Sequence, residues 1–374
     1  MSAVERMKFV AKRRTGAERG SALILVTASI TILIAFAIIA IDGPILLTTK
    51  GQLQAAADAA ALAGASGLLE GSQDLAVQRA IEYAGFNIAV QDMARPVIIS
   101  AADISFPQAD IIRVETHRTE ATGDALRTYF RRLIVATQPN TADVTAVAMA
   151  QAQDICGAKC LKPWAVPDRW VDANGNNQYD TGEYYETGVT SYQAPQDVGL
   201  SIVLKLGNED DPIAPGQFFP VAYPPLDYPG ETPNTGGEWY RTWIEECTPY
   251  TVGPGDRLLL EPGNKTGPTR QGVESLIAQD PGAHWDAGNK TVAGSAFGLS
   301  PRIALVPFFD PTQPPQSGRN WVRVAKVAVI FIEQISSDGQ VSGRFMSITT
   351  PGTPCAPGAG GAPGTFLKGV TLIS

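Results

Sequence analysis

Oxygen-bearing side chains recur at alternate positions of one short segment, residues 172–183. They occupy positions 1, 3, 5, 9 and 12 of a twelve-residue loop, and position 7 would offer its backbone carbonyl. Calcium needs six or more oxygen ligands from a tightly curled loop, and this is the ligand spacing of EF-hand-like sites. The sequence therefore predicts a structural Ca²⁺ site formed by Asp172, Asn174, Asn176, Gln178, Asp180 and Glu183.

The residues around these ligands favour an isolated loop over a paired EF-hand. Position 6 is Asn177, and asparagine tolerates the positive φ that glycine usually supplies there. Pro163 and Pro167 precede the loop, so no clear helix leads into it. Three carboxylates predict weak binding, with a Kd on the order of 10⁻⁴–10⁻³ M. The alternative is an Asx-rich turn that holds no ion.

Four cysteines, Cys156, Cys160, Cys247 and Cys355, all follow the long apolar run described below. If this part of the chain is exported, an oxidising compartment favours two disulfides, and three pairings stay open. The spacing between Cys156 and Cys160 differs from the C-x-x-C spacing of redox enzymes. We therefore expect structural disulfides, with free thiols as the alternative.

Catalytic signals are sparse. The chain has only two histidines, His117 and His284, and lacks the G-x-S-x-G and H-E-x-x-H motifs. Its formal charge of −8 offers no basic stripe for nucleic acid. We expect a protein that is not an enzyme and has no nucleic-acid partner.

Residues 21–41 are mostly apolar and contain no charged side chain. As a helix they would span about 31 Å, the thickness of a bilayer core. A cleavable signal peptide is the alternative, but its apolar core is shorter. Residues 1–20 carry six basic and two acidic side chains. The positive-inside rule therefore places residues 1–20 in the cytoplasm, 21–41 in the membrane and 42–374 outside, as a single-pass topology.

Small residues repeat every fourth position on two parts of the N-terminal segment. Eight of residues 55–65 are alanine, so we expect the helix to continue out of the membrane to about residue 70. Small residues at this spacing allow close helix association. The alternative is that the exported alanine face packs on its own domain. The predicted helix-partner face consists of Thr27, Thr31, Ala35, Ala57, Ala61 and Ala65.

Composition changes near residue 150, and we place the domain boundary at about residue 153. The first 150 residues hold 4 of the 28 prolines and none of the six tryptophans. Proline breaks helices and shortens strands. We therefore expect an α+β fold, with a helix and small α+β unit over 42–153 and a β-rich, loop-heavy domain over 154–374. In the first part periodicity predicts helices over 75–84 and 126–135 and strands over 111–116 and 142–150. In the second part it predicts strands over 201–206, 258–260, 303–309, 322–332 and 341–348.

The N-terminal pattern resembles a known family. Arg19-Gly20 precedes the apolar span, Asp42 ends it, and the run GQLQAAADAAALA follows at residues 51–63. This resembles TadE/TadG-like proteins of Flp (tight-adherence) pilus assembly. The stretches at residues 160–170, 261–269 and 278–286 also resemble longer TadG-like proteins.

The resemblance implies a pilin-like N-terminal helix in the bacterial inner membrane. Its partners would be other pilus-assembly or pilin-like membrane proteins, bound through this helix, in a type IV-like pilus machine that acts in adhesion. Leu25 stands where a prepilin cut after Gly20 would carry glutamate, so a minor pilin-like or assembly role fits better than a major pilin. The alternative is a calcium-stabilised surface adhesin that binds a surface or glycan. Exposure of Trp239 and Trp243 to solvent would favour this alternative.

Overall fold

The chain divides into two compact units. The computed structural model describes residues 17–91, 93–130, 139–207, 212–315, 320–355 and 364–373. For residues 17–21 and 90–94 it describes the backbone alone. Unit 1 comprises residues 1–150 with 372–374, and unit 2 comprises residues 151–371. Most of the predicted basic segment 1–20 lies outside the described residues. The division falls beside the predicted boundary at residue 153, near the change in composition.

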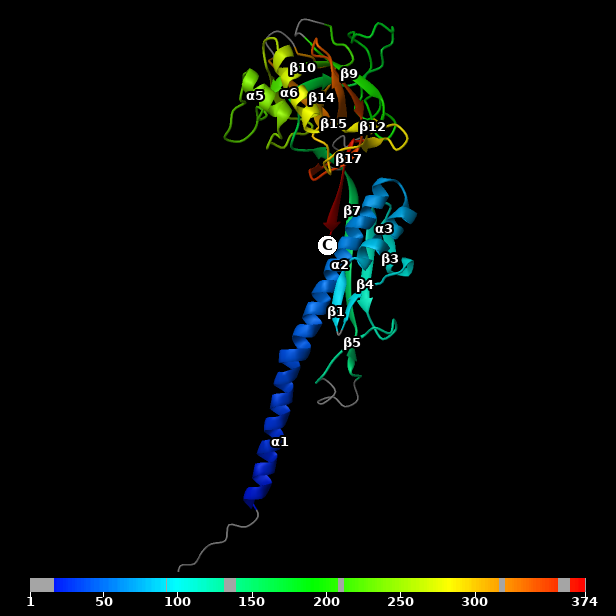
Figure 1. The fold of residues 1–374 in the computed structure, drawn as a ribbon, viewed down its shortest axis with the longest axis vertical. Coiled ribbons are helices and arrows are strands. Elements are labelled where there is room, and N and C mark those ends of the chain that lie inside the picture. Colours follow the sequence, from blue (N-terminus) through cyan, green and yellow to red (C-terminus); the bar gives the residue numbers. More distant parts are fainter. Residues whose placement is uncertain are drawn as a thin grey trace, which may run out of the picture. The chain divides into compact units, whose positions relative to one another are not determined.

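Unit 1 is built on one continuous helical stretch (Figure 1). Helix α1 (Ala17–Ala37) passes through a π-helical turn, η1 (Ile38–Asp42), into helix α2 (Gly43–Leu69). Within the part of the chain that the structure describes, this is the only helix long and apolar enough to cross a membrane. The predicted continuation beyond the span to about residue 70 is therefore present.

Helix α2 packs against helix α3 (Gln73–Gly85) through small side chains. Ala76, Ala80 and Ala84 of α3 are buried, as are the alanines of the facing α2 surface. Gly67 lets the two backbones approach, since a Cβ built there would lie 2.6 Å from the Ala76 backbone. Ser72 begins α3 by accepting a hydrogen bond from the Leu75 N–H at 3.1 Å.

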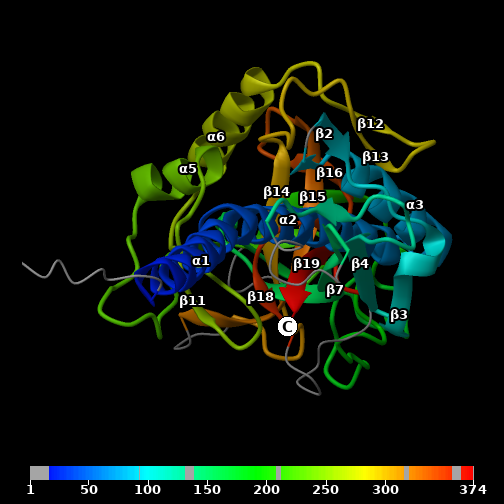
Figure 2. The same cartoon turned by 90° about the horizontal axis from the view of Figure 1, so that it is seen from below.

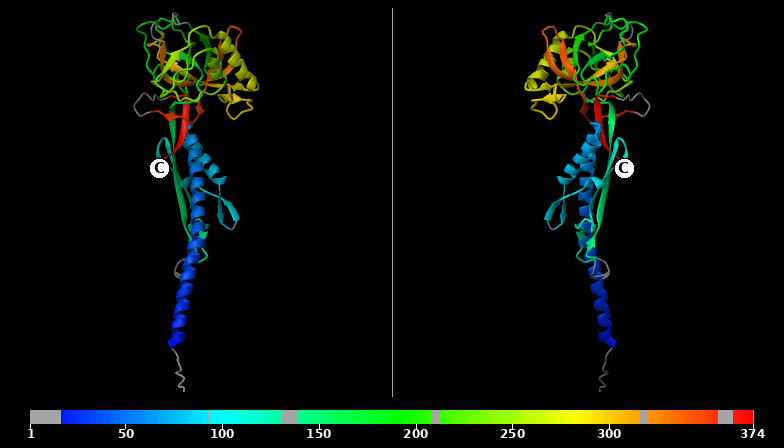
Figure 3. Two further views of the ribbon diagram at one scale, coloured as in Figure 1. Left: turned by 90° about the vertical axis from the view of Figure 1, so that its left-hand side faces the viewer. Right: turned by 90° about the vertical axis from the view of Figure 1, so that its right-hand side faces the viewer.

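Strands complete unit 1, which includes residues 144–150 of strand β7. Figure 3 shows α3 and the first hairpin on one side of α2. Hairpin β1–β2 is antiparallel, β3 pairs with β4, β4 with β7 and β5 with β6. The bounds are β1 Ile88–Gln91, β2 Met93–Pro96, 3-10 turn η2 Ala101–Asp103, β3 Ile104–Gln108, β4 Ile111–Arg118, β5 Leu126–Arg127, β6 Thr141–Ala142 and β7 Val144–Gly157.

The helix predicted over 126–135 is wrong in its described part. Leu126 and Arg127 form a strand that pairs with Ala142 and Thr141, and residues 131–138 lie outside the description. Leu126 is fully buried, so cross-strand pairing and burial outweigh the local helical spacing of the apolar residues.

Unit 2 contains a closed, barrel-like sheet. The path β10-β8-β14-β15-β16-β9 closes because β9 pairs with β10, while β11 bridges β10 and β15. The β8–β14 and β9–β10 pairs are parallel and the other described pairs are antiparallel. The strands are β8 Trp164–Pro167, β9 Ser201–Leu206, β10 Gln217–Ala222, β11 Arg257–Leu260, β14 Ile303–Phe309, β15 Trp321–Ile335 and β16 Val341–Phe345.

The inside of this sheet is filled by large side chains, including Trp164, Phe218, Phe308 and Phe345. Strands β9 and β14 have the predicted bounds. The remaining strands are β12 His284–Asp286, β13 Thr291–Ala293, β17 Ile348–Thr349, β18 Thr353–Pro354 and β19 Leu367–Ile373.

Two helices of unit 2, α5 (Gly237–Glu245) and α6 (Thr266–Gln279), lie side by side (Figure 2). We expected strands and loops there, because proline is frequent. Pro268 lies in the first turn of α6, where its missing N–H has no helical acceptor, so proline is tolerated. The coarse expectation of an N-terminal helix followed by a strand-rich part is confirmed.

All four cysteines are paired within unit 2. Cys156 bonds to Cys355 and Cys160 to Cys247. The expectation of two disulfides is confirmed, and the structure selects one of the three pairings that the sequence left open.

Candidate functional site

The loop predicted to bind calcium is curled by its own side-chain oxygens. Asp172 accepts hydrogen bonds from the backbone N–H groups of Gly175 and Asn177, both at 2.8 Å. The side-chain oxygens of Asn174 and Asn176 accept the N–H groups two residues further on, at 2.9 and 2.7 Å. Asn177 has φ 57°, the positive value expected at position 6. The alternate side chains therefore turn toward the inside of the curl.

The remaining predicted ligands meet on the same loop. Asp180 Oδ2 accepts the side-chain amides of Asn174 and Asn176 at 2.7 and 2.8 Å. Glu183 accepts the backbone N–H groups of Ala173 and Asp180 at 2.9 and 3.1 Å. Positions 1, 3, 5, 9 and 12 thus form one hydrogen-bonded network. Amide and carboxylate oxygens of this kind are the ligands that calcium prefers.

Both ends of the loop are fixed to unit 2. Val171 pairs with Tyr184 in an antiparallel bridge. Tyr179, at position 8, packs edge-on against Trp170 with ring centroids 5.7 Å apart, and its N–H donates to the Ile213 carbonyl at 2.8 Å. Tyr179 is therefore partly buried against the core of unit 2.

Asp168, just before the loop, is fully buried in a satisfied polar network. Lys326 Nζ lies 3.0 Å from its Oδ2, the Tyr185 hydroxyl donates to the same oxygen at 3.2 Å, and Tyr192 N–H donates to Oδ1 at 3.1 Å. Burial raises the pKa of Asp168 and lowers the pKa of Lys326, and the attraction between the two charges opposes both shifts. The network ties the segment leaving the loop to strand β15.

Among the described residues no group of three or more His, Cys, Asp or Glu side chains could hold a metal ion. Of the six residues predicted as ligands, only Asp172, Asp180 and Glu183 carry carboxylates. The calcium site therefore stays a prediction.

The membrane half of the predicted helix-partner face is open. Thr27 and Thr31 are exposed and Ala35 is partly exposed. Each threonine hydroxyl donates to the carbonyl four residues earlier, at 2.8 and 2.9 Å. These hydroxyls are therefore satisfied within α1, and the face would meet a partner mainly through methyl groups.

The prediction for the half of that face beyond the apolar span needs correction. Ala57, Ala61 and Ala65 are fully buried inside unit 1, where α2 meets α3 and β4. Alanine buries little area, so its benefit here is the close approach of the chain's own helix and strand. The alternative, that this face packs on its own domain, is the arrangement observed.

Polar residues of the same run hold the strands beside α2. The Gln54 side-chain amide donates to Asp58 at 2.8 Å and to the Val147 carbonyl of β7 at 3.0 Å. The Thr116 hydroxyl of β4 donates to the Leu53 carbonyl at 2.9 Å. The small residues of the GQLQAAADAAALA run therefore pack inside unit 1, and its polar residues form hydrogen bonds there.

The sequence did not reveal the role of Asp42. Its side chain is 3% exposed and accepts N–H groups from Tyr129 at 2.9 Å and from Phe130 at 3.0 Å. A carboxylate directly after an apolar span was the available signal, but its partners are more than 80 residues away.

Trp239 and Trp243, whose exposure would favour binding to a surface, differ in exposure. Their rings stack with centroids 5.4 Å apart, and Trp239 is 45% exposed whereas Trp243 is 8% exposed. One aromatic face is thus available to a ligand. Trp243 belongs to the core of unit 2.

Two of the stretches that resemble longer TadG-like proteins are joined by a buried hydrogen-bond chain. Trp164 Nε1 donates to the Tyr240 hydroxyl at 2.9 Å, and that hydroxyl lies 3.0 Å from the Thr269 hydroxyl. The third stretch, 278–286, is held by Arg302, which donates to the Asp280 and Ala283 carbonyls. All three segments are therefore parts of the unit 2 scaffold.

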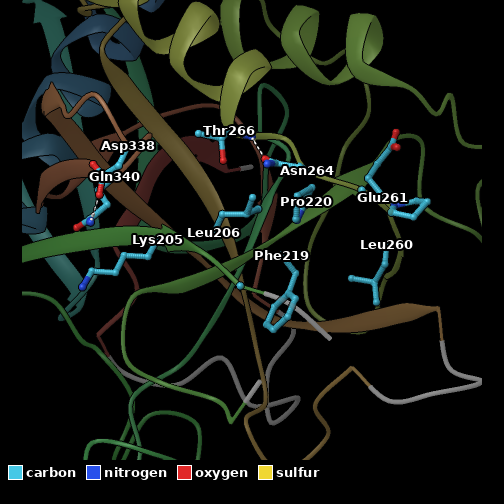
Figure 4. Close-up of a pocket in the computed structure, with 13 residues that line it drawn as sticks. Lys205, Leu206, Phe219, Pro220, Leu260, Glu261, Asn264, Thr266, Asp338 and Gln340 are labelled. Carbon is cyan, nitrogen blue, oxygen red and sulfur yellow. Dashed lines mark hydrogen bonds between the residues drawn. The ribbon is translucent and has the colours of Figure 1, made fainter. Parts of the chain in front are cut away.

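A groove of about 690 Å³ opens beside β9, β10 and the start of α6 (Figure 4). Its acidic groups already have partners in the protein: Glu261 pairs with Lys265 at 3.0 Å and accepts the Gly236 N–H, while Asp338 accepts hydrogen bonds from Ser336 and Gln340. No side chain drawn there stands out as a nucleophile with an adjacent base.

The comparison with protein families concerns the N-terminal helix. Residues 20–67 match the model of a family described as putative Flp pilus-assembly TadE/G-like. Residues 20–67 are therefore similar to this family. The predicted resemblance is confirmed for this stretch, which runs from α1 through η1 to Gly67 near the end of α2. No curated protein and no solved structure matches the chain.

Proposed function

We propose that this protein is a membrane-anchored, non-catalytic component of a Flp/Tad type IV-like pilus machine, with a minor pilin-like or assembly role in adhesion. The observation that carries the proposal is the match of residues 20–67 to the Tad family model. It coincides with the one described helix that is apolar enough to span a membrane and that then packs into unit 1. The partners would be other pilus-assembly or pilin-like membrane proteins.

The proposed topology follows from charge. The basic residues 1–20 would stay in the cytoplasm and residues 42–374 would be exported across the bacterial inner membrane. The exposed apolar side chains of α1, such as Leu23, Leu33 and Phe36, would face lipid or a partner helix. The two disulfides fit an oxidising compartment.

A count of surface pili by electron microscopy tests the assembly role. A clean deletion strain should lose pili, and expression of the intact chain should restore them. A matched chain lacking residues 21–41 should be produced but fail to restore pili, because it lacks the anchor. Normal piliation in the deletion strain would reject the proposal.

We propose calcium binding at residues 172–183 as part of a second candidate function, a calcium-stabilised module that binds a surface or glycan. The curled loop and the exposed ring of Trp239 support it. The ion would replace the amide hydrogen bonds to Asp180 and stiffen the loop. It would have a structural role.

Terbium luminescence and thermal unfolding in millimolar Ca²⁺ test this site. The intact protein should gain stability with rising Ca²⁺, as any ligand that binds the folded state requires. Glu183→Gln should abolish the gain, whereas Glu186→Gln, an exposed glutamate just outside the loop, should keep it. An intact protein whose unfolding is unaffected by millimolar Ca²⁺ would rule the site out.

A further inference from the structure

The junction between α1 and the rest of unit 1 contains features that weaken a helix. The π turn η1 ends at Asp42, and Gly43 and Pro44 follow directly. A π turn interrupts the regular ladder, glycine is flexible, and proline cannot donate to the carbonyl four residues earlier. Sharp helix bends occur at such combinations. Residues 38–44 are therefore a natural hinge.

In the part of the chain that the structure describes, the buried side chains of α2 begin beyond this hinge, whereas Ile34 and Ala35 before it and Ile38 within it are partly buried. Thr49 and Leu53 are the first buried side chains of α2, and the buried small residues follow from Ala56 onward. Among the described side chains ahead of Thr49, Asp42 is the one that is buried, seven residues earlier. Those seven residues correspond to about 10 Å of helix. Asp42 is thus a buried contact within the hinge, on the α1 side of Gly43-Pro44.

The contact is specific to a carboxylate. One oxygen of Asp42 accepts the Tyr129 N–H at 2.9 Å and the other accepts the Phe130 N–H at 3.0 Å. A buried carboxylate is costly unless donors reach it, and backbone N–H groups are good donors. The two amides come from the chain just after β5. The side chain therefore joins the end of the membrane helix to the strands of unit 1.

We propose that Asp42 is a latch that closes the hinge at residues 38–44 and makes α1 move as one body with the rest of unit 1. When the Asp42 carboxylate accepts its backbone hydrogen bonds, the helical segment without buried contacts to the rest of unit 1 ends at the outer end of the span. When the carboxylate is released, this segment lengthens by about 10 Å and α1 can swing at Gly43-Pro44. The device goes beyond the proposed pilus role, and the spectroscopic labels report on it whether or not a strain makes pili.

Distance measurements between two spin labels test the latch in the full chain in detergent or nanodiscs. All four native cysteines are disulfide-bonded, so Phe36→Cys on α1 and Glu82→Cys on α3 give two accessible label sites. The protein with Asp42 should show one narrow distance distribution. Asp42→Ala should broaden it about twofold or more, since a hinge replaces a fixed joint.

Asp58→Ala is the matched control, because it removes a partly buried acid from the same helix beyond the hinge. It should leave the distribution narrow. A second label pair, Ala55→Cys and Glu82→Cys, lies entirely beyond the hinge and should stay narrow in Asp42→Ala. Broadening of this second pair as well would mean that Asp42 supports folding of unit 1 as a whole, and the latch would be overturned.

Restoring a regular helix should make the latch unnecessary. A Cβ at Gly43 would meet only the Ile38 carbonyl, at an ordinary 3.8 Å, so Gly43→Ala fits, and Pro44→Ala returns a backbone donor. Adding both to Asp42→Ala should narrow the Phe36–Glu82 distribution again. An Asp42→Ala distribution as narrow as that of the unaltered protein would overturn the latch, and a failed rescue would overturn the hinge at Gly43-Pro44.

Discussion

Unit 2 buries several charged side chains, and Lys162 is one of them. Its side chain is 6% exposed, and Nζ donates to the Ile244 carbonyl at 2.5 Å and to the Glu246 carbonyl at 3.3 Å. These carbonyls lie at the end of α5, where a cation is favoured by the helix dipole. Burial nevertheless lowers the pKa of Lys162 to about 8.

This pKa shift predicts a pH dependence of stability. Between pH 8 and 10.5 the unfolded chain binds more protons at this lysine than the folded one, so the free energy of unfolding should rise with pH. From pH 8 to 10 the gain should be about 2 kcal/mol. Lys162→Met removes the titrating group, so the difference between the two proteins in urea unfolding isolates the effect. If the free energies of unfolding of the two proteins changed with pH in the same way, the predicted effect of Lys162 would be contradicted.

At the scale of elements, the α2–α3 pair shows how glycine and alanine determine packing. Gly67 faces the Ala76 backbone, where a Cβ would lie only 2.6 Å away, whereas Gly51 faces open space. Both glycines lie in α2, so they share the same helical context. The difference between them is the neighbouring helix.

Gly67→Ala and Gly51→Ala should therefore act in opposite directions. Gly67→Ala should push α3 away and destabilise the pair by about 1–3 kcal/mol. Gly51→Ala should stabilise α2 by about 0.5–1 kcal/mol, because alanine favours the helix and meets nothing. Hydrogen exchange of the α2 and α3 amides measures both effects. Equal protection in the two variants would show that the glycines are not packing positions.

At the scale of the whole molecule, the disulfides and the membrane helix belong to different units. Both disulfides lie in unit 2, with sequence separations of 199 and 87 residues. Unit 1 contains no cysteine and holds together through α2 and its neighbours.

Reduction should therefore act on unit 2 alone. Loops of these lengths predict a loss of about 5 kcal/mol for each disulfide in the chain-entropy model, although measured losses are often smaller. The double change Cys156→Ser and Cys355→Ser should lower the unfolding temperature of unit 2 and leave amide protection of α2 and α3 unchanged. Loss of protection in α2 would show that the two units do not unfold independently.

The sequence by itself determined the features that depend on local pattern and on composition. The uncharged run at 21–41, the alanine-rich continuation and the Tad resemblance need no tertiary information, because a span is defined by length and polarity. The bounds of β9 and β14 followed from their apolar runs. The alternate oxygens of residues 172–183 predicted a curl that the hydrogen bonds from Asp172 and Asn174 reproduce.

Only the tertiary structure decided the features that depend on distant partners. It paired Cys156 with Cys355, buried Ala57 and its neighbours against their own unit, and made a strand at Leu126 where local spacing favoured a helix. It also gave Asp42 its donors, Tyr129 and Phe130. The physical reason is common to all four. Burial and pairing are set by residues far apart in the chain, and their free energy outweighs the small differences in local propensity.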